Sequence, residues 1–323
     1  SFFILVILAS CGEDKRKGSA PFTGDVFDDS HLHEIRLYFK EPGFWDTLVY
    51  NKKLKDSLEI NHYSKCDVSM DGVELKDIGI RLKGESSYDF TKTKKKSFKI
   101  DFNSFIKKQR MKGISRLNLN NNYKDPSLLR EKLALDMVAK AGLPAPRSAY
   151  TKVYINDEYW GLYLMVEAIN KDFLKRNFGA ASGNLYFGEP NGTLEKLAKE
   201  ADYQRAYRKK NNRKRNDWTD LIQFVNSLNG MESAAKQEAE LDSIFNLDAC
   251  LKIWAINNLL VNVDAYNLMY PHNYFLYRDT SSKKLNWINY DYNYSFAAWN
   301  PKFNYREVCD LSVFYHNPKF QMA

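Results

Sequence analysis

Cysteine is scarce in this chain, and the few cysteines lie far apart. Four occur in 323 residues, at Cys11, Cys66, Cys250 and Cys309. None belongs to a Cys-x-x-Cys pair or to another spacing typical of metal ligands, which disfavours a cysteine-based zinc site. We expect Cys66, Cys250 and Cys309 to be small buried hydrophobic residues.

Internal repeats and long apolar runs are also missing. No unit of about 20 to 50 residues recurs, which disfavours solenoids and propellers. The apolar run Phe2–Leu8 is too short to span a bilayer. It could be a first buried strand. However, a short apolar run followed by small residues and then Cys11 resembles a bacterial lipoprotein signal. We therefore expect residues 1–11 to be that signal, Cys11 to be lipidated, and residues 12–30, polar and without periodicity, to be a flexible tether.

The composition is that of a large folded protein. Hydrophobic residues make up 44% of the chain and aromatic residues 15%, enough to bury a substantial core. The formal net charge of +8 is compatible with phosphate, nucleic acid, an acidic protein or a membrane surface as partner, and charge alone does not choose among them.

The pattern of the chain changes near its middle. Short alternating segments from His33 to Tyr163 predict antiparallel strands and hairpins, with one turn at Asp71-Gly72. One helix over 125–141, capped by Asp125, is predicted among them. Beyond Gly183 the apolar spacing is mainly helical. The basic run 205–215 is either a solvated linker or a site for an acidic substrate or anionic lipid surface. These features predict an α+β fold in two lobes, residues 31–170 rich in strands and residues 171–323 rich in helices.

Two acids occur in apolar, tyrosine-rich surroundings in the second half. Asp264 follows the apolar helix segment 247–263, Asn273 lies in "HNYFLY", and Asp291 lies in "WINYDYNYSFA" after an expected strand. A carboxylate away from water needs a partner, and the usual partner is a metal ion. Phosphoryl transfer requires a divalent metal, a carboxylate near the attacking hydroxyl and a cation on the phosphates. Asp264, Asn273 and Asp291 together supply ligands and a carboxylate of this kind.

Several segments between Ile78 and Ala297 resemble the spore coat protein H (CotH) family of atypical secreted protein kinases. They include "IRLKGESS", "KKSFKIDF", "DPSLLREKLALDM", "GNLYFGE", "VDAYN" and "HNYFLY", in the expected order. The resemblance implies a bilobal protein-kinase-like fold that uses ATP and Mg²⁺ or Mn²⁺ to phosphorylate Ser or Thr of extracytoplasmic proteins. With a lipid anchor at Cys11, it implies a protein held at a bacterial membrane or cell surface; nucleic acid is not an expected partner.

The resemblance also implies roles for individual residues. Asp264 would be the catalytic acid that orients the acceptor hydroxyl, and Asp291 and Asn273 would hold the metal. For the nucleotide phosphates we predict Lys96, which shares strand alternation with Phe98. The remaining predicted nucleotide-site residues are Glu131 as the carboxylate that positions the lysine, Glu167 beside the adenine, and Arg81 before the "GESS" turn.

The chain departs from the family pattern near the metal ligands. Asn293 stands where the family has a second acid, Tyr290 precedes Asp291 where the family has Trp, and Ala297 ends the turn where the family has Gly. An inactive nucleotide-binding surface protein is therefore an alternative function. A metal-dependent nuclease is disfavoured, because neither a clustered acidic triad nor a histidine base accompanies Asp264.

Overall fold

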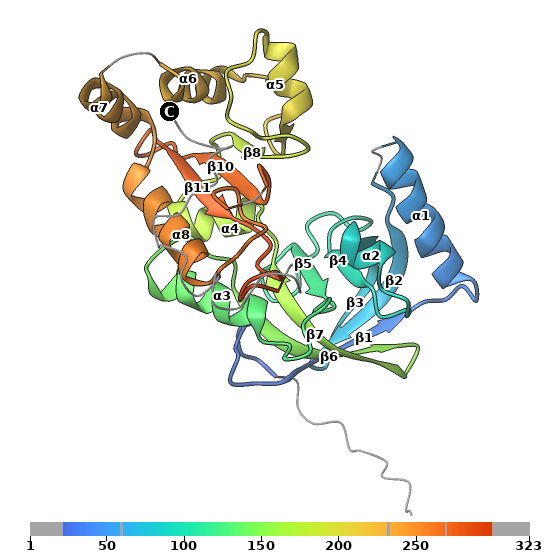
Figure 1. Cartoon of the computed structure of the whole chain (residues 1–323). Coiled ribbons are helices and arrows are strands. Elements are labelled where there is room, and N and C mark those ends of the chain that lie inside the picture. Colours follow the sequence, from blue (N-terminus) through green and yellow to red (C-terminus); the bar gives the residue numbers. More distant parts are fainter. Residues whose placement is uncertain (1–21, 59–60, 231–232, 269, 299–323) are drawn as a thin grey trace, which may run out of the picture.

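The computed structural model describes residues 22–58, 61–230, 233–268 and 270–298. Strands and helices are mixed throughout, as an α+β fold requires (Figure 1). Cys11, Cys309 and the expected signal segment lie outside the described residues. Cys66 and Cys250 are buried free thiols, as predicted.

The strand-rich half forms a closed barrel of seven strands in the order β1-β2-β3-β4-β5-β7-β6, which the sequence did not predict. Parallel pairing of β1 with β6 closes it, while the other pairs are antiparallel. The predicted turn at Asp71-Gly72 joins β2 to β3, and Asn156-Asp157 joins β6 to β7. The strands are β1 (His33–Tyr38), β2 (Ser64–Met70), β3 (Val73–Lys83), β4 (Ser97–Asp101), β5 (Arg116–Asn120), β6 (Ser148–Ile155) and β7 (Glu158–Glu167).

Strand alternation fills the barrel with apolar side chains. Ile80 and Leu82 of β3, Phe98 and Ile100 of β4, and Leu119 of β5 belong to one hydrophobic cluster. The intervening positions on these strands carry Arg81, Lys83, Lys99, Asn118 and Asn120, so the outer face of β3, β4 and β5 is polar. Two helices accompany the barrel, α1 (Phe44–Leu58) and α2 (Ser86–Asp89).

The second half surrounds a four-stranded sheet in the order β11-β10-β8-β9. Its strands are β8 (Leu185–Phe187), β9 (Arg208–Lys209), β10 (Tyr274–Arg278) and β11 (Leu285–Asn289). The helices are α4 (Lys171–Phe178), α5 (Glu200–Ala206), α6 (Thr219–Leu228), α7 (Ala234–Ile244) and α8 (Leu247–Leu259). The helix α8 lies beside the sheet and contributes Cys250 and Ile253 to the core of this half, while its Leu251 and Leu259 are exposed (Figure 1). Among the helices of the described residues, none combines the length and the apolar character needed to cross a membrane.

The helix α3 (Arg130–Lys140) connects the two halves. Ala134, Leu135 and Val138 of α3 share a hydrophobic cluster with Leu164 on the outer face of β7 and with Ile253 of α8. The helix begins at Arg130, later than predicted. Asp125 instead caps the preceding turn, accepting hydrogen bonds from the backbone N–H groups of Ser127 and Arg130.

The segment before β1 is folded from Phe22 onward, which corrects the predicted tether over 12–30. Val26 and Phe27 are buried against the barrel, and the backbone N–H of Phe22 donates to the carbonyl of Asp71. Burial of the apolar side chains of Val26 and Phe27 favours packing of this segment, although most of its residues are polar.

Candidate functional site

Asp264 and Asn273 are joined by hydrogen bonds. The side-chain amide of Asn273 donates to the Asp264 carboxylate at 2.9 Å and to the Asp264 carbonyl at 3.0 Å. The second carboxylate oxygen of Asp264 faces Nε2 of His272 at 2.9 Å. Both oxygens of a nearly buried carboxylate are therefore held in fixed directions.

The β10–β11 hairpin brings Asp291 to the same place. Asn273 immediately precedes β10, and the backbone N–H of Tyr290 donates to the Asn273 carbonyl at 2.8 Å, which extends the ladder by one pair. Asp291 follows Tyr290. Asn273 and Asp291 both have φ of +62°, a left-handed conformation that Asn and Asp tolerate better than most residues. The strands thus end in two turns that present an amide and a carboxylate side by side.

A network of buried asparagines supports the loop that carries Asp264. Asn257 of α8 donates to Asn267 at 3.1 Å, and Asn267 donates to Asn258 at 2.7 Å. The backbone N–H of Asn262 bonds the carbonyl of Asn257 at 2.8 Å. Hydrogen bonds between buried side chains restrict the motion of the segment that they connect. Residues 257–267 are therefore preorganised around Asp264.

The acids of the site affect one another. Burial raises the pKa of Asp291, the charge of Lys83 opposes this rise, and the charge of Asp264 adds to it. Burial, followed by the charge of Asp291, raises the pKa of Glu131 to about 7, against the effect of Lys83. Burial alone would lower the pKa of His272, but its hydrogen bond with Asp264 raises it. Negative charge therefore accumulates here beyond what Lys83 balances, as expected for a cation-binding site.

Lys83, which the sequence analysis did not select, links the barrel to these acids. Its ammonium donates to Oδ1 of Asn120 at 2.7 Å and to the hydroxyl of Tyr290 at 3.3 Å. The amide of Asn120 donates in turn to both carboxylate oxygens of Glu131, at 2.9 and 2.7 Å. Glu131 of α3 therefore positions Lys83 through Asn120. Glu131 is therefore linked to Lys83, through Asn120, and not to Lys96, the lysine with which the sequence analysis paired it.

Positive charge gathers next to Lys83 on the outer face of the barrel. Arg81 of β3 lies directly opposite Lys99 of β4. Burial lowers the pKa of Lys99 well below its usual range, and the charges of Arg81, Lys210 and Lys83 add to the effect. Lys210 lies just after β9, so part of the basic run 205–215 reaches this group. A cluster of this kind is typical of a polyanion site.

Lys96 does not reach this group, and we correct its assignment. Its ammonium donates to the backbone carbonyls of Tyr88 and Thr91 and lies 4.6 Å from the centre of the Tyr88 ring. The strand face that contains Phe98 and Ile100 is the barrel interior, where both side chains are fully buried. The outer, polar side of the strand is the opposite one, which carries Lys99.

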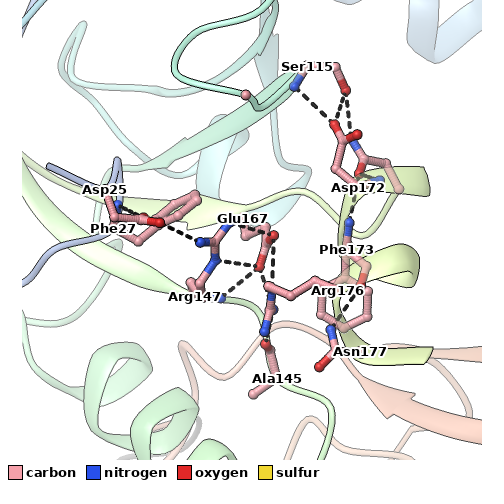
Figure 2. A network of polar contacts seen from close by, with 12 residues as sticks. Asp25, Phe27, Ser115, Ala145, Arg147, Glu167, Asp172, Phe173, Arg176 and Asn177 are labelled. Atoms are coloured by element: carbon pink, nitrogen blue, oxygen red, sulfur yellow. Dashed lines mark hydrogen bonds and ion pairs between the residues drawn. The ribbon is translucent and has the colours of Figure 1, made fainter. Parts of the chain in front are cut away.

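The Glu167 carboxylate forms ion pairs with two arginines (Figure 2). Arg147 forms an ion pair with its carboxylate at 3.1 Å and Arg176 of α4 at 2.6 Å, while Glu167 is only 3% exposed. Arg147 also pairs with Asp25 at 2.9 Å. Glu167 is the last residue of β7. Because side chains alternate along a strand, Glu167 lies on the same side of β7 as the inward-facing Met165, and on the opposite side from Leu164 and Val166. Its contacts are those of a structural ion-pair network that joins β7 to α4.

Two buried polar atoms fit a metal ion and a polyanion. Oδ1 of Asn293 is buried without a hydrogen-bond partner among the described residues, while the Asn293 backbone N–H donates to Asp291. Nε of Arg81 is also buried without a partner there. An amide oxygen beside two carboxylates suits Mg²⁺, and a guanidinium N–H beside a lysine suits phosphate. The residues present therefore fit a divalent cation and a phosphorylated ligand.

Comparisons with known proteins identify the family of this chain. Residues 80–319 match the sequence profile of the CotH kinase protein family. The chain is 28% identical over 232 residues to the inner spore coat protein H of Bacillus subtilis (strain 168). That alignment covers 69% of this chain and 59% of the length of the relative. Arg81, Lys83, Lys99, Glu131, Asp264, Asn273 and Asp291 all lie inside the matched range.

Proposed function

This chain belongs to the CotH kinase protein family, and we propose that it transfers the γ-phosphate of ATP to Ser or Thr hydroxyls of a protein outside the cytoplasm. The observation that carries the proposal is the position of Lys83. It lies between a cationic group, Arg81 and Lys99, and an acidic group, Asp264 and Asp291. A nucleotide triphosphate bound with a divalent metal has the charges that complement both groups.

Each residue has a role in this reaction. Arg81, Lys83 and Lys99 bind the phosphates, and Glu131 holds Lys83 in place through Asn120. Asp291 and Asn273 hold Mg²⁺ or Mn²⁺, which when bound neutralises charge on the phosphates. Asp264 orients the acceptor hydroxyl and takes its proton, because its carboxylate is fixed by His272 and Asn273. In this proposal residues 31–170 are the amino lobe and residues 171–323 the carboxyl lobe of a kinase-like fold.

We propose a location at the surface of a bacterial cell, with a lipid anchor at Cys11. Two points support it: the lipoprotein-like sequence before Cys11, and the similarity to a protein named for the spore coat of Bacillus subtilis. The acceptor is then a secreted or surface protein. The anchor can be tested by metabolic labelling with a radioactive fatty acid, which should be incorporated into the full chain but not into Cys11→Ala.

Asn293 favours a second candidate, a nucleotide-binding protein with weak or no turnover. An amide supplies one oxygen and no charge where the family pattern has an acid, so it holds a divalent ion less firmly. The unpartnered Oδ1 of Asn293 supports retained metal binding. Retained metal binding favours the active kinase over this second candidate.

Transfer of labelled phosphate from ATP tests the proposal. The parent should label itself or an added acidic or basic carrier protein with Mg²⁺ or Mn²⁺, and Asp291→Ala should reduce labelling to background. If the parent binds ATP but transfers no phosphate, the inactive alternative holds. If the parent binds no ATP with either metal, both candidates fail.

A further inference from the structure

A second group of metal-type ligands lies at the far end of β3 from Lys83. His31 precedes β1, His33 is the first residue of β1, and Asp71 forms the turn between β2 and β3. One ligand atom from each lies within 4.8 Å of the other two. Because β3 has 11 residues, its two ends are roughly 35 Å apart. This group therefore does not belong to the site around Asp264.

The hydrogen bonds of His33 place one of its ring nitrogens against a carboxylate, at a position that a proton or a metal ion can fill. Its Nε2 lies 2.9 Å from the backbone carbonyl of Asp28, which can only accept, so Nε2 carries a proton. In a neutral ring Nδ1 is then a lone pair, yet it lies 2.7 Å from a carboxylate oxygen of Asp71. Two acceptors at this distance repel unless a proton lies between them, and a metal ion can replace that proton once the two atoms separate to about 3.3 Å. His33 is fully buried and the Asp71 side chain is 2% exposed, so bulk water does not screen the contact.

The carbonyl of Asp28 accepts a hydrogen bond from the ring nitrogen of His33 that faces away from Asp71, as the hydrogen-bond partner of a metal-bound histidine does. Histidines that bind metals usually donate their other ring N–H to a carbonyl or carboxylate, which fixes the tautomer and the ring orientation. Asp71 is fixed as well, because its other oxygen accepts from the Glu34 backbone N–H at 2.8 Å. The two ligands are therefore preorganised by β1 and by the β2–β3 turn.

His31 provides the third ligand, and its partly exposed side chain gives a metal ion access from solvent. Its Nε2 lies 3.7 Å from Asp71, its side chain is 38% exposed, and its ring stacks on Phe22 at 4.1 Å. Ligands about 2.0–2.1 Å from a tetrahedral zinc ion lie roughly 3.3 Å from one another. Only small movements of the histidine rings and of Asp71 separate the present distances from this arrangement.

Lys112 is the competing cation. Its ammonium lies 3.8 Å from Asp71 and donates to the Phe22 carbonyl at 2.5 Å. Lys112 lies against the same carboxylate oxygen as His33, so a metal ion must displace its ammonium from that oxygen. Its charge lowers the affinity of the group for a metal ion without removing a ligand.

We propose that His31, His33 and Asp71 form a second metal site that takes a divalent transition metal such as Zn²⁺. Imidazole ligands suit Zn²⁺, Ni²⁺, Co²⁺ and Cu²⁺, whereas Mg²⁺ prefers oxygen ligands, so the site discriminates against the metal expected near Asp264. A metal bound here clamps the segment 22–31 onto the barrel. The proposal is independent of the proposed kinase activity.

Titration of the full chain with Co²⁺ and Zn²⁺ tests the proposal. The parent should bind one Co²⁺ with the weak visible absorption of nitrogen and oxygen ligands, in the presence of excess Mg²⁺. His31→Ala and Asp71→Asn should each weaken Zn²⁺ binding about tenfold or more. Lys112→Ala should strengthen it about threefold or more, because a competing charge is removed. His62→Ala, a change of an exposed histidine, is the control and should bind like the parent.

The results separate the proposal from its alternatives. If the parent binds neither metal at micromolar concentrations, a proton joins His33 to Asp71 and the proposal is wrong. It is also wrong if the Co²⁺ spectrum shows thiolate ligands, or if His31→Ala and His62→Ala have equal effects. Because His31 is partly exposed, its variant should fold, which a thermal melt without metal verifies. Asp291→Ala should leave Zn²⁺ binding unchanged, which separates this site from the kinase proposal.

Discussion

Arg81 and Lys99 lie directly opposite each other on adjacent strands of the barrel, although both side chains are basic. Like charges at opposite positions of an antiparallel pair destabilise a sheet. The burial that lowers the pKa of Lys99 adds to this cost. A fold keeps such an arrangement when a ligand of opposite charge offsets the repulsion, and the proposed ligand is the triphosphate of ATP.

Replacing Lys99 should therefore affect stability and nucleotide binding in opposite directions. In Lys99→Gln the repulsion with Arg81 disappears, and we expect the free energy of unfolding without nucleotide to be unchanged or to rise by about 0.5 kcal/mol. The affinity for ATP should fall about tenfold or more, because a charge-assisted contact to phosphate is lost. Thermal melts with and without ATP measure both effects.

Lys96→Ala is the matched control for that experiment. The ammonium of Lys96 bonds the carbonyls of Tyr88 and Thr91, so its loss should leave ATP affinity unchanged even if the melting temperature drops. If Lys96→Ala weakens ATP binding while Lys99→Gln does not, the assignment of the phosphate-facing side of β4 is reversed.

Lys83→Met should abolish phosphate transfer with the fold intact. The variant keeps the length of the side chain but removes the charge between the acids and the cationic group, and we expect kcat to fall about 10²-fold or more. Tyr290→Phe removes only the weaker 3.3 Å contact to Lys83 and should cost less than tenfold. Comparable losses in the two variants would show that the hydroxyl, not the ammonium, is the essential group.

Glu131 should make stability depend on pH. Its pKa in the folded protein is raised to about 7, from an ordinary value near 4.5. A raised pKa means that its contribution to stability is complete below pH 4.5 and is lost as pH rises through 7. Gln cannot ionise, so the free energy of unfolding of Glu131→Gln, relative to the parent, should increase over this range by about 3 kcal/mol at most.

Denaturant unfolding at pH 4.5, 6 and 8 measures this difference. Glu238→Gln, at an exposed position of α7, is the control and should follow the parent at each pH. A constant difference between Glu131→Gln and the parent across the three pH values would mean that Glu131 does not change protonation in this range.

Of the candidate residues selected from the sequence, the structure brings the acidic group together, whereas Lys96 lies apart from it. Asp264, Asn273 and Asp291 could be selected because acids and amides stand out in an apolar, tyrosine-rich stretch, and the β10–β11 hairpin does bring them together. For the lysines, alternation along β4 correctly put Phe98 and Ile100 on an inner face, but it could not show that this face is closed to a ligand. Closure of the barrel, through the parallel pairing of β1 with β6, decides that, and it depends on contacts far apart in the chain.

Long-range contacts also explain the remaining differences. Glu167 looked available for a ligand because its partners Arg147 and Arg176 lie in a loop and in α4, where nothing in the sequence marks them as ion-pair partners. Lys83 was missed because its link to Glu131 passes through Asn120, an uncharged residue. Sequence patterns reveal local periodicity and unusual residues, but they do not reveal an uncharged residue that links two charged side chains.

His272 should report on the charge of Asp264. The hydrogen bond and the charge of Asp264 raise the pKa of His272 against the effect of burial, so Asp264→Asn should lower that pKa. NMR titration of the histidine ring measures the shift directly. The same variant should reduce kcat about 10²-fold or more while ATP still binds, because the group that takes the hydroxyl proton is lost. Full activity in Asp264→Asn would remove Asp264 from the catalytic role.

Asn293→Asp tests whether the amide limits metal binding. A carboxylate at this position would join Asp264 and Asp291, so the metal-free protein should lose about 1–2 kcal/mol of stability through repulsion between nearby buried acids. The same charge should raise Mg²⁺ affinity about tenfold and increase phosphate transfer at low Mg²⁺ concentration. Asn293→Ala removes the unpartnered oxygen without adding charge, and should weaken Mg²⁺ binding while leaving the metal-free stability nearly unchanged. Opposite changes in metal affinity for these two variants would place the Asn293 oxygen on the metal; equal affinities in Asn293→Asp, Asn293→Ala and the parent would exclude it.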